Sequence, residues 1–135
     1  FVPTDAHGLV RGLDAVYAAG DLTDFPVKQG GIATQQADAA AESIAAAAGV
    51  PIDPQPFSPV LRGLLLTGLT PRYLRTEPGS VRSAVDTEPL WWPPAKIVGR
   101  HLAPFLASQL HLSESPPPTN GESVAVDVDL QSHVP

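Results

Sequence analysis

The chain has 135 residues, a formal net charge of -6, 16 prolines and no cysteine. This length allows one modest hydrophobic core, and the proline content predicts long irregular segments, because proline lacks a backbone N–H donor and has a fixed φ. The acidic balance excludes a general nucleic-acid binder, which needs a basic face for the phosphates. Without cysteine, these residues hold no disulfide, thiolate zinc site or dithiol redox centre.

Targeting and metal-binding signals are missing from the sequence. The chain begins at Phe1 without the charged and apolar regions of a signal peptide, and no apolar run is long enough to span a bilayer. We therefore expect a cytoplasmic protein that meets a membrane at its surface, if at all. The start at Phe1 also indicates a piece of a larger protein. The four histidines lack a metal-ligand spacing, so we expect no metal site.

The first part of the chain predicts a strand followed by a long helix. Residues 1 to 14 are rich in turn formers and predict a small hairpin. Residues 16 to 19 form an apolar run before Gly20, which is typical of a strand covered on both faces in a parallel or mixed sheet. Alanine-rich residues 30 to 48 predict a helix that Gly49 ends.

One face of this helix is made of small residues. Three polar residues, Gln35, Asp38 and Glu42, lie elsewhere on the cylinder. Because small side chains permit close approach, we expect the small face to pack against a sheet or another helix. The face consists of Ala33, Ala37, Ala40, Ile44 and Ala47.

The middle of the chain predicts a connector and a hairpin. Residues 51 to 59 contain four prolines and predict a stiff, extended connector, where we place the main domain boundary. Residues 60 to 67 are strongly apolar, residues 68 to 71 can turn, and residues 72 to 76 can return as a second strand, which predicts an antiparallel hairpin. Residues 77 to 88 are polar and predict a loop.

The last part of the chain predicts a helix and a tail. Residues 90 to 112 show helical spacing of apolar side chains, with the Pro-Pro pair at 93–94 suited to the first turn. Pro104 lies deeper and predicts a kink or split. Residues 113 to 123 predict a proline-rich linker, and residues 124 to 130 alternate apolar with acidic side chains. This alternation suits either a weak strand or a disordered acidic tail.

The strand end and the helix start form a candidate ligand site. Asp21 follows the strand, where open α/β sheets bind ligands, and its carboxylate can accept hydrogen bonds from polyol hydroxyls. The helix start at Gly30 has no Ser, Thr, Asp or Asn cap, so its N–H groups and dipole favour an anionic or accepting ligand group. Lys28 can add a positive charge there. The structural alternatives are a turn-capping Asp, a water-satisfied glycine cap and a solvated Lys.

A second candidate surface lies in the segment that contains two adjacent tryptophans. Trp91 and Trp92, with Lys96 and Arg100, suit docking on an anionic membrane surface. The alternative is a helix packed on its own domain or on a twin subunit. Because the chain is acidic overall and the segment has only two cations, we favour packing.

The sequence VYAAGD at residues 16–21 and KQGGIATQQADAAAESIAA at residues 28–46 resemble the second flavin-binding signature of the pyridine nucleotide-disulfide oxidoreductase superfamily. Within it, they are most similar to the branch of type II NADH dehydrogenases and sulfide:quinone oxidoreductases. The resemblance implies FAD as cofactor and NAD(P)H as co-substrate. It also implies that the 60–76 hairpin and the Trp-Trp-Pro-Pro segment belong to the C-terminal domain of that family.

The resemblance implies roles for particular residues. Asp21, next to Gly20, would hold the ribityl hydroxyls of FAD, and Lys28 would lie near the pyrimidine edge of the flavin ring. The helix start would point at the same edge, so that reduced flavin's negative charge meets the helix dipole. The backbone there belongs to Gly30, Gly31 and Ile32.

The chain departs from the family pattern, and these departures restrict the function that we predict for it. The chain lacks a GxGxxG unit for the ADP half of FAD and a separate NAD(P) unit, and it lacks the redox cysteines of sulfide:quinone oxidoreductases. We therefore expect an α+β chain that forms the C-terminal part of an FAD-dependent NAD(P)H oxidoreductase. It would comprise the last strand and helix of an FAD-binding domain (1–50), a hairpin-and-helix domain (51–112) and a tail (113–135).

The predicted place of the chain in an FAD-dependent enzyme determines its expected partners. They are FAD, the N-terminal part of the same protein and, in a homodimer, a second copy. The alternative, of a different class, is a non-catalytic dimerisation or membrane-docking module of a larger protein, formed by the hairpin and the Trp-bearing helix. In that case any contact with flavin would be incidental.

Overall fold

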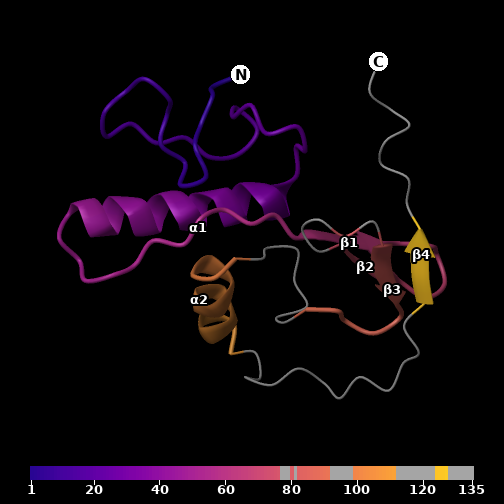
Figure 1. Cartoon of the computed structure of the whole chain (residues 1–135). Helices are drawn as coiled ribbons and strands as arrows, with labels where there is room; N and C mark the ends of the chain where they lie inside the picture. Colours follow the sequence, from indigo (N-terminus) through magenta and orange to yellow (C-terminus); the bar gives the residue numbers. More distant parts are fainter. Residues whose placement is uncertain (77–79, 81, 92–98, 112–123, 128–135) are drawn as a thin grey trace.

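The computed structural model describes residues 1–76, 80, 82–91, 99–111 and 124–127. These residues form a small α+β arrangement, which confirms the expected class, whereas its assignment to an FAD-binding fold stays a prediction. An irregular N-terminal segment and a proline-rich connector lie along one long helix, and an antiparallel sheet lies near the N-terminal end of that helix (Figure 1). The elements are α1 (Gly30–Ala47), β1 (Leu61–Leu65), β2 (Arg72–Thr76), β3 (Arg82–Asp86), α2 (Leu102–Gln109) and β4 (Val124–Asp127).

The N-terminal segment is held by isolated bridges. Thr4 and Val10 form an antiparallel bridge across a turn, as the predicted hairpin requires. The predicted strand at residues 16–19 is wrong, because only Tyr17 forms a bridge, to Leu9, and the described residues offer it no sheet. Without neighbouring strands, Val16 is exposed instead of covered on both faces.

Helix α1 begins and ends close to the predicted positions. Gln29 is the N-cap residue, and Gly49 adopts φ 88° just after the helix, as a left-handed C-terminal stop does. The helix packs closely on the N-terminal segment at Gly8, whose φ is 78°. A Cβ atom at Gly8 would stand 3.0 Å from Ala40 Cβ, so this approach requires glycine.

The predicted packing face of α1 is largely wrong. Of its five residues only Ala40 is buried, and Ala37, Ile44 and Ala47 are exposed. The polar residues Asp38 and Glu42 are buried instead. Their side chains accept hydrogen bonds from other segments, and these bonds offset the unfavourable burial of charge.

The proline-rich connector runs back along α1, as Figure 1 shows, and it has no regular structure of its own. Its backbone is tied at several points: Phe57 N–H donates to Ala6 O at 2.6 Å, and Val60 N–H donates to Gln35 Oε1 at 2.9 Å. The Phe57 ring also packs edge-on against Phe25, with ring centroids 5.1 Å apart. The extended conformation is confirmed, and the proposed domain boundary within it stays a prediction.

The sheet has four antiparallel strands in the order β1-β2-β3-β4. The predicted hairpin is confirmed as β1 and β2, with Leu61 opposite Thr76 and Leu65 opposite Arg72. The predicted loop at residues 77–88 is wrong in part, because β3 lies there. Its residues pair with the neighbouring β2 and with β4, which is distant in the sequence, and pairing on both edges stabilises this polar strand. Of the two alternatives for the tail, residues 124–127 form a strand.

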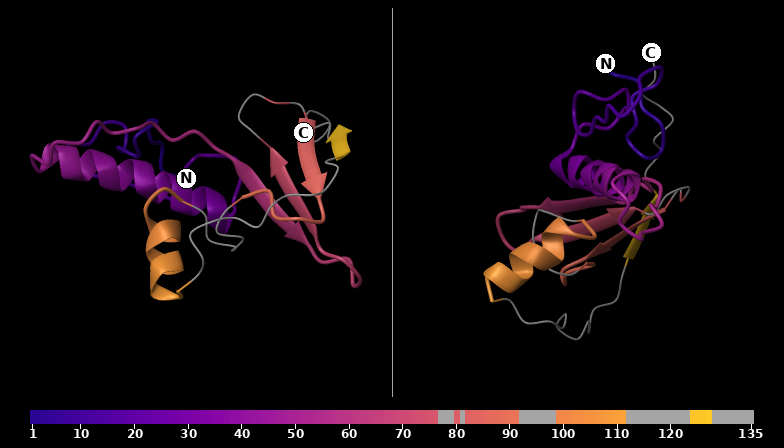
Figure 2. Two further views of the ribbon diagram at one scale, coloured as in Figure 1. Left: turned by 90° about the horizontal axis from the view of Figure 1, so that it is seen from below. Right: turned by 90° about the vertical axis from the view of Figure 1, so that its left-hand side faces the viewer.

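Helix α2 is shorter than predicted, and its axis runs across that of α1 (Figure 2). Pro104 does not kink it, because Pro104 is the third residue of the helix, where its backbone nitrogen needs no intrahelical partner. The Pro-Pro pair predicted for a first turn lies outside the described residues. Trp91 is buried and packs edge-on against Tyr73, with ring centroids 5.3 Å apart, so packing is confirmed for this tryptophan.

Gln36 ties the N-terminal segment to α1, and its removal should destabilise the fold. Gln36→Ala would leave the partly buried Gly20 N–H and the buried Thr23 hydroxyl with one partner fewer. We expect the free energy of unfolding to fall by about 1–3 kcal/mol, measured by urea denaturation and circular dichroism. Gln109→Ala, which truncates an exposed glutamine, is the control. An equal loss of unfolding free energy in both variants would contradict the role of Gln36.

Candidate functional site

The Gly20 turn lies against the first turns of α1. Gly20 N–H donates to Gln36 Oε1 at 2.7 Å, and the Thr23 hydroxyl donates to Gly20 O at 2.9 Å. Gln36 Nε2 in turn donates to Thr23 Oγ1 at 3.2 Å, which closes a buried ring of hydrogen bonds. Gly20 has φ 85°, and a Cβ atom there would stand 3.5 Å from Ala33 Cβ. The turn and the beginning of α1 are therefore brought together.

Asp21 is exposed at this turn. None of the described residues donates a hydrogen bond to its carboxylate, so its oxygens can accept bonds from a ligand. Its neighbour Thr23 is fully buried and fixes the loop that carries it. The turn thus holds the Asp21 carboxylate at the protein surface on a loop that is fixed by hydrogen bonds.

The N-terminus of α1 has no side-chain cap. Gln29 is the N-cap residue with an extended backbone, and the first turn contains no acidic residue. Gln29 Nε2 donates to Arg62 O at 2.7 Å, so this side chain is bound to β1. Ala33 N–H makes the first helical bond, to Gln29 O. Within the described chain, the N–H groups of Gly30, Gly31 and Ile32 have no acceptor, and the positive end of the helix dipole lies there.

Lys28 is bound within the loop that precedes α1. Its ammonium donates to Thr23 O and to Phe25 O, each at 2.6 Å, and lies 4.2 Å from the centroid of the Phe1 ring. These contacts close residues 23–28 into a compact loop. The expected position of Lys28 beside a flavin ring stays a prediction.

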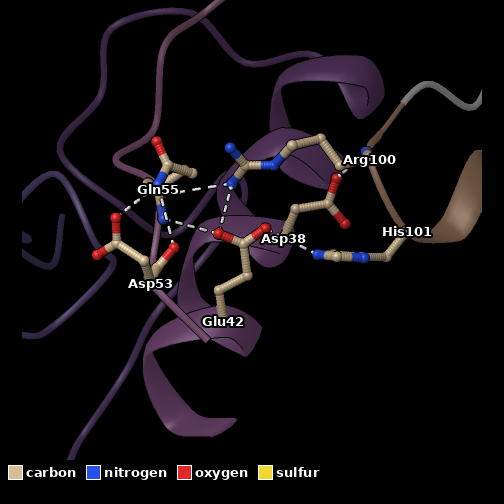
Figure 3. Close-up of polar contacts among 6 residues, drawn as sticks. All are labelled: Asp38, Glu42, Asp53, Gln55, Arg100 and His101. Carbon is tan, nitrogen blue, oxygen red and sulfur yellow. Dashed lines mark hydrogen bonds and ion pairs between the residues drawn. The ribbon is translucent and has the colours of Figure 1, made fainter. Parts of the chain in front are cut away.

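A second polar cluster lies further along α1, and sequence reasoning missed it. Asp38 accepts the backbone N–H of Arg100, and Glu42 accepts hydrogen bonds from three donors (Figure 3). These donors are Gln55 N–H at 2.7 Å, His101 Nε2 at 2.8 Å and Arg100 Nη2 at 3.1 Å. Both carboxylates are buried, whereas Arg100 and His101 are half exposed.

The electrostatics of this cluster favour an ionised Glu42. Burial raises the pKa of the Glu42 carboxyl, but the Gln55 N–H and His101 hydrogen bonds and the Arg100 and His101 charges outweigh it, so that the pKa is lowered. The cluster ties the connector and the start of α2 to α1. Because both carboxylates already have partners in the chain, we assign it a structural role.

A cavity of about 250 Å³ lies beside this cluster, between α1, the connector and residues 99–100. Asp38 and Arg100 form part of its wall, together with Phe57 and Arg62. Gly99 lies close to α1, because a Cβ atom there would stand 2.6 Å from Asp38 Oδ2 and would force that side chain to shift. The described residues contain no group of three or more histidine, cysteine or acidic side chains that could hold a metal ion.

Comparisons with known proteins give no match: no family model, no curated protein and no solved structure is similar to this chain. The helices that the structure describes include none long and apolar enough to cross a membrane.

The Glu42 cluster should make stability depend on pH. A carboxyl with a lowered pKa in the folded state adds stability above its ordinary pKa of 4.5 and loses it as pH falls through the folded-state pKa. We expect Glu42→Gln to be less stable than wild type at neutral pH, with the difference shrinking below about pH 4.5. Urea denaturation across pH measures this. Glu88→Gln, at an exposed glutamate, is the control, and a constant difference for Glu42→Gln would contradict the role of its charge.

Proposed function

We propose that this chain is the C-terminal part of an FAD-dependent NAD(P)H oxidoreductase and that it holds the reacting end of the flavin. The observation that carries the proposal is the uncapped start of α1 beside the Gly20–Asp21 turn. An exposed carboxylate and a set of free N–H groups are the two kinds of partner that a polyol chain and an electron-accepting ring edge need. The resemblance of these residues to the second flavin signature of pyridine nucleotide-disulfide oxidoreductases supports the same assignment.

Each part of the site has a defined task in this proposal. Asp21 accepts hydrogen bonds from the ribityl hydroxyls, and its position is fixed by Gly20 and by the Gln36 ring of hydrogen bonds. The backbone N–H groups at the start of α1 bind the N1 and C2 carbonyl region. FAD, when bound, supplies the electron-transfer chemistry, and the helix dipole stabilises negative charge at that edge.

These 135 residues supply only part of such an enzyme. The chain contains no GxGxxG unit for the ADP half of FAD and no second unit for NAD(P)H. We therefore expect these residues alone to show no NADH oxidation when FAD is added. Flavin binding is therefore measured on the full-length protein, of which these residues form one part in this proposal.

Asp21 should be required for flavin retention. We expect Asp21→Ala to weaken FAD binding by roughly 10- to 100-fold, because a hydrogen bond to a charged group contributes about 1.5–3 kcal/mol. The flavin content of the purified protein, read from its absorbance spectrum and by chromatography of the released cofactor, measures this. Asp24→Ala removes an exposed carboxylate three residues away and should leave the flavin content unchanged. Purified wild type without flavin, which also fails to bind added FAD, would overturn the proposal.

The start of α1 offers a test that separates binding from folding. A Cβ atom at Gly30 would meet no other atom within 4 Å, and Gly30 is exposed, so Gly30→Asp and Gly30→Ala should both fold. Aspartate in the first turn should stabilise the helix by about 0.3–1 kcal/mol and yet weaken flavin binding, because it competes for the dipole and repels negative charge. Alanine should stabilise the protein by roughly 1 kcal/mol and keep the flavin. If both variants retain FAD equally, the helix start does not face the ring.

A further inference from the structure

An apolar groove lies between α1 and α2, whose axes cross (Figure 2). Its volume of about 540 Å³ is within the usual range of small-molecule sites. Alanines of α1 and two large apolar side chains of α2 line it, and the latter are open to a ligand, because Leu102 is 41% and Phe105 is 59% exposed. These lining residues are Ala33, Ala37, Ala41, Leu102 and Phe105.

Asp38 adds an acidic side chain to the wall of this groove. It is only 5% exposed, and the described residues give its carboxylate a single hydrogen bond, from the backbone N–H of Arg100. The Arg100 guanidinium is bonded to Glu42 instead, as Figure 3 shows. A carboxylate can accept about four hydrogen bonds, and a buried one is normally paired with a cation. Asp38 therefore has room for a cationic donor.

The other polar side chains that line the groove already have partners within the chain. The Thr34 hydroxyl donates to Gly30 O at 2.9 Å, and His101 Nε2 is bonded to Glu42 Oε1 at 2.8 Å. A ligand in the groove would therefore find its polar partner in Asp38. An anionic ligand would be repelled there, and a wholly apolar one would remove the carboxylate from water without pairing it.

We propose that the groove binds an organic cation, whose protonated amine pairs with Asp38 and whose apolar body lies between the α1 alanines and Phe105. The small alanine side chains let a flat body approach the helix closely, and an aromatic body would also pack on the Phe105 ring. Neither the Gly20–Asp21 turn nor residues 30–32 line the groove. The proposal therefore does not depend on flavin binding, and either can fail without the other.

The test compares three probes that share one body and differ in charge: phenylbutylamine, phenylbutanol and phenylbutanoate. Isothermal titration calorimetry on the full-length protein at neutral pH measures their affinities. We expect the amine to bind roughly tenfold more tightly than the alcohol, because a hydrogen bond to a charged group is stronger than one between neutral groups. The carboxylate should not bind. Equal affinities of amine and alcohol, or an amine that does not bind, would overturn the proposal.

Asp38→Asn tests the partner of the amine. Asparagine keeps a side-chain oxygen that can accept the Arg100 N–H, so the variant should fold, but it removes the charge. We expect the affinity for the amine to fall about tenfold, to that of the alcohol, while the affinity for the alcohol stays unchanged. Asp14→Asn, at an exposed aspartate outside the groove, should change neither affinity.

Two results with Asp38→Asn would contradict the proposal. One is an unchanged affinity for the amine. The other is a wild-type dimer that this variant dissociates, because a second copy of the chain would then supply the cation.

A further variant covers the case in which Asp38→Asn fails to fold. Ala41 is exposed and lines the groove, so Ala41→Leu should fold and narrow the groove while it leaves the Asp38 carboxylate in place. We expect the amine and the alcohol to lose affinity by a similar factor, of roughly tenfold. Ala47→Leu, at an exposed alanine of α1 outside the groove, is the control. Unchanged binding of the amine to Ala41→Leu would mean that it binds elsewhere and would overturn the proposal.

Discussion

The fold depends on four polar side chains of α1, each of which bonds a backbone N–H of another part of the chain. The segments held in this way have little regular structure, so their N–H groups lack the partners that a helix or sheet would supply. Two glutamines and two carboxylates provide these acceptors from one rigid helix. Gln36 binds Gly20, Gln35 binds Val60, Asp38 binds Arg100 and Glu42 binds Gln55.

This arrangement explains how a chain with 16 prolines, and with few buried apolar side chains among its described residues, keeps a defined path. A hydrophobic contact tolerates some displacement of its partners, whereas a buried acceptor must meet its donor at a short distance and a narrow angle. Loss of one donor leaves a buried charge or amide unpaired, which costs more than the bond itself contributes. The polar side chains of α1 therefore fix where the Gly20 turn, the connector and the start of α2 lie.

The sequence predicts the elements that local signals determine, which are α1 with its stop at Gly49 and the β1–β2 hairpin. It does not predict β3, whose polar residues become a strand through pairing with the adjacent β2 on one side and the distant β4 on the other. The spacing of the alanines predicts the wrong side of α1 as the buried one. A signal was present, because Gln35, Asp38 and Glu42 are spaced three and four residues apart and so share one face. Asp21 and the uncapped helix start can be found from sequence, whereas Arg100 and His101 reach Glu42 only through the tertiary fold.

The beginning of α1 is costly as a helix start. Ser, Thr, Asp or Asn at the N-cap would add about 1 kcal/mol over a residue that does not cap, and each glycine in a helix loses up to roughly 1 kcal/mol relative to alanine. Both losses of stability apply at this helix start, which consists of Gln29, Gly30 and Gly31. The alanine-rich body of the helix compensates for them. A local departure from good helix design, placed beside an exposed carboxylate on a rigid turn, is typical of a binding site. Because no side chain caps the helix, its first N–H groups stay open to an accepting ligand, as the flavin proposal requires.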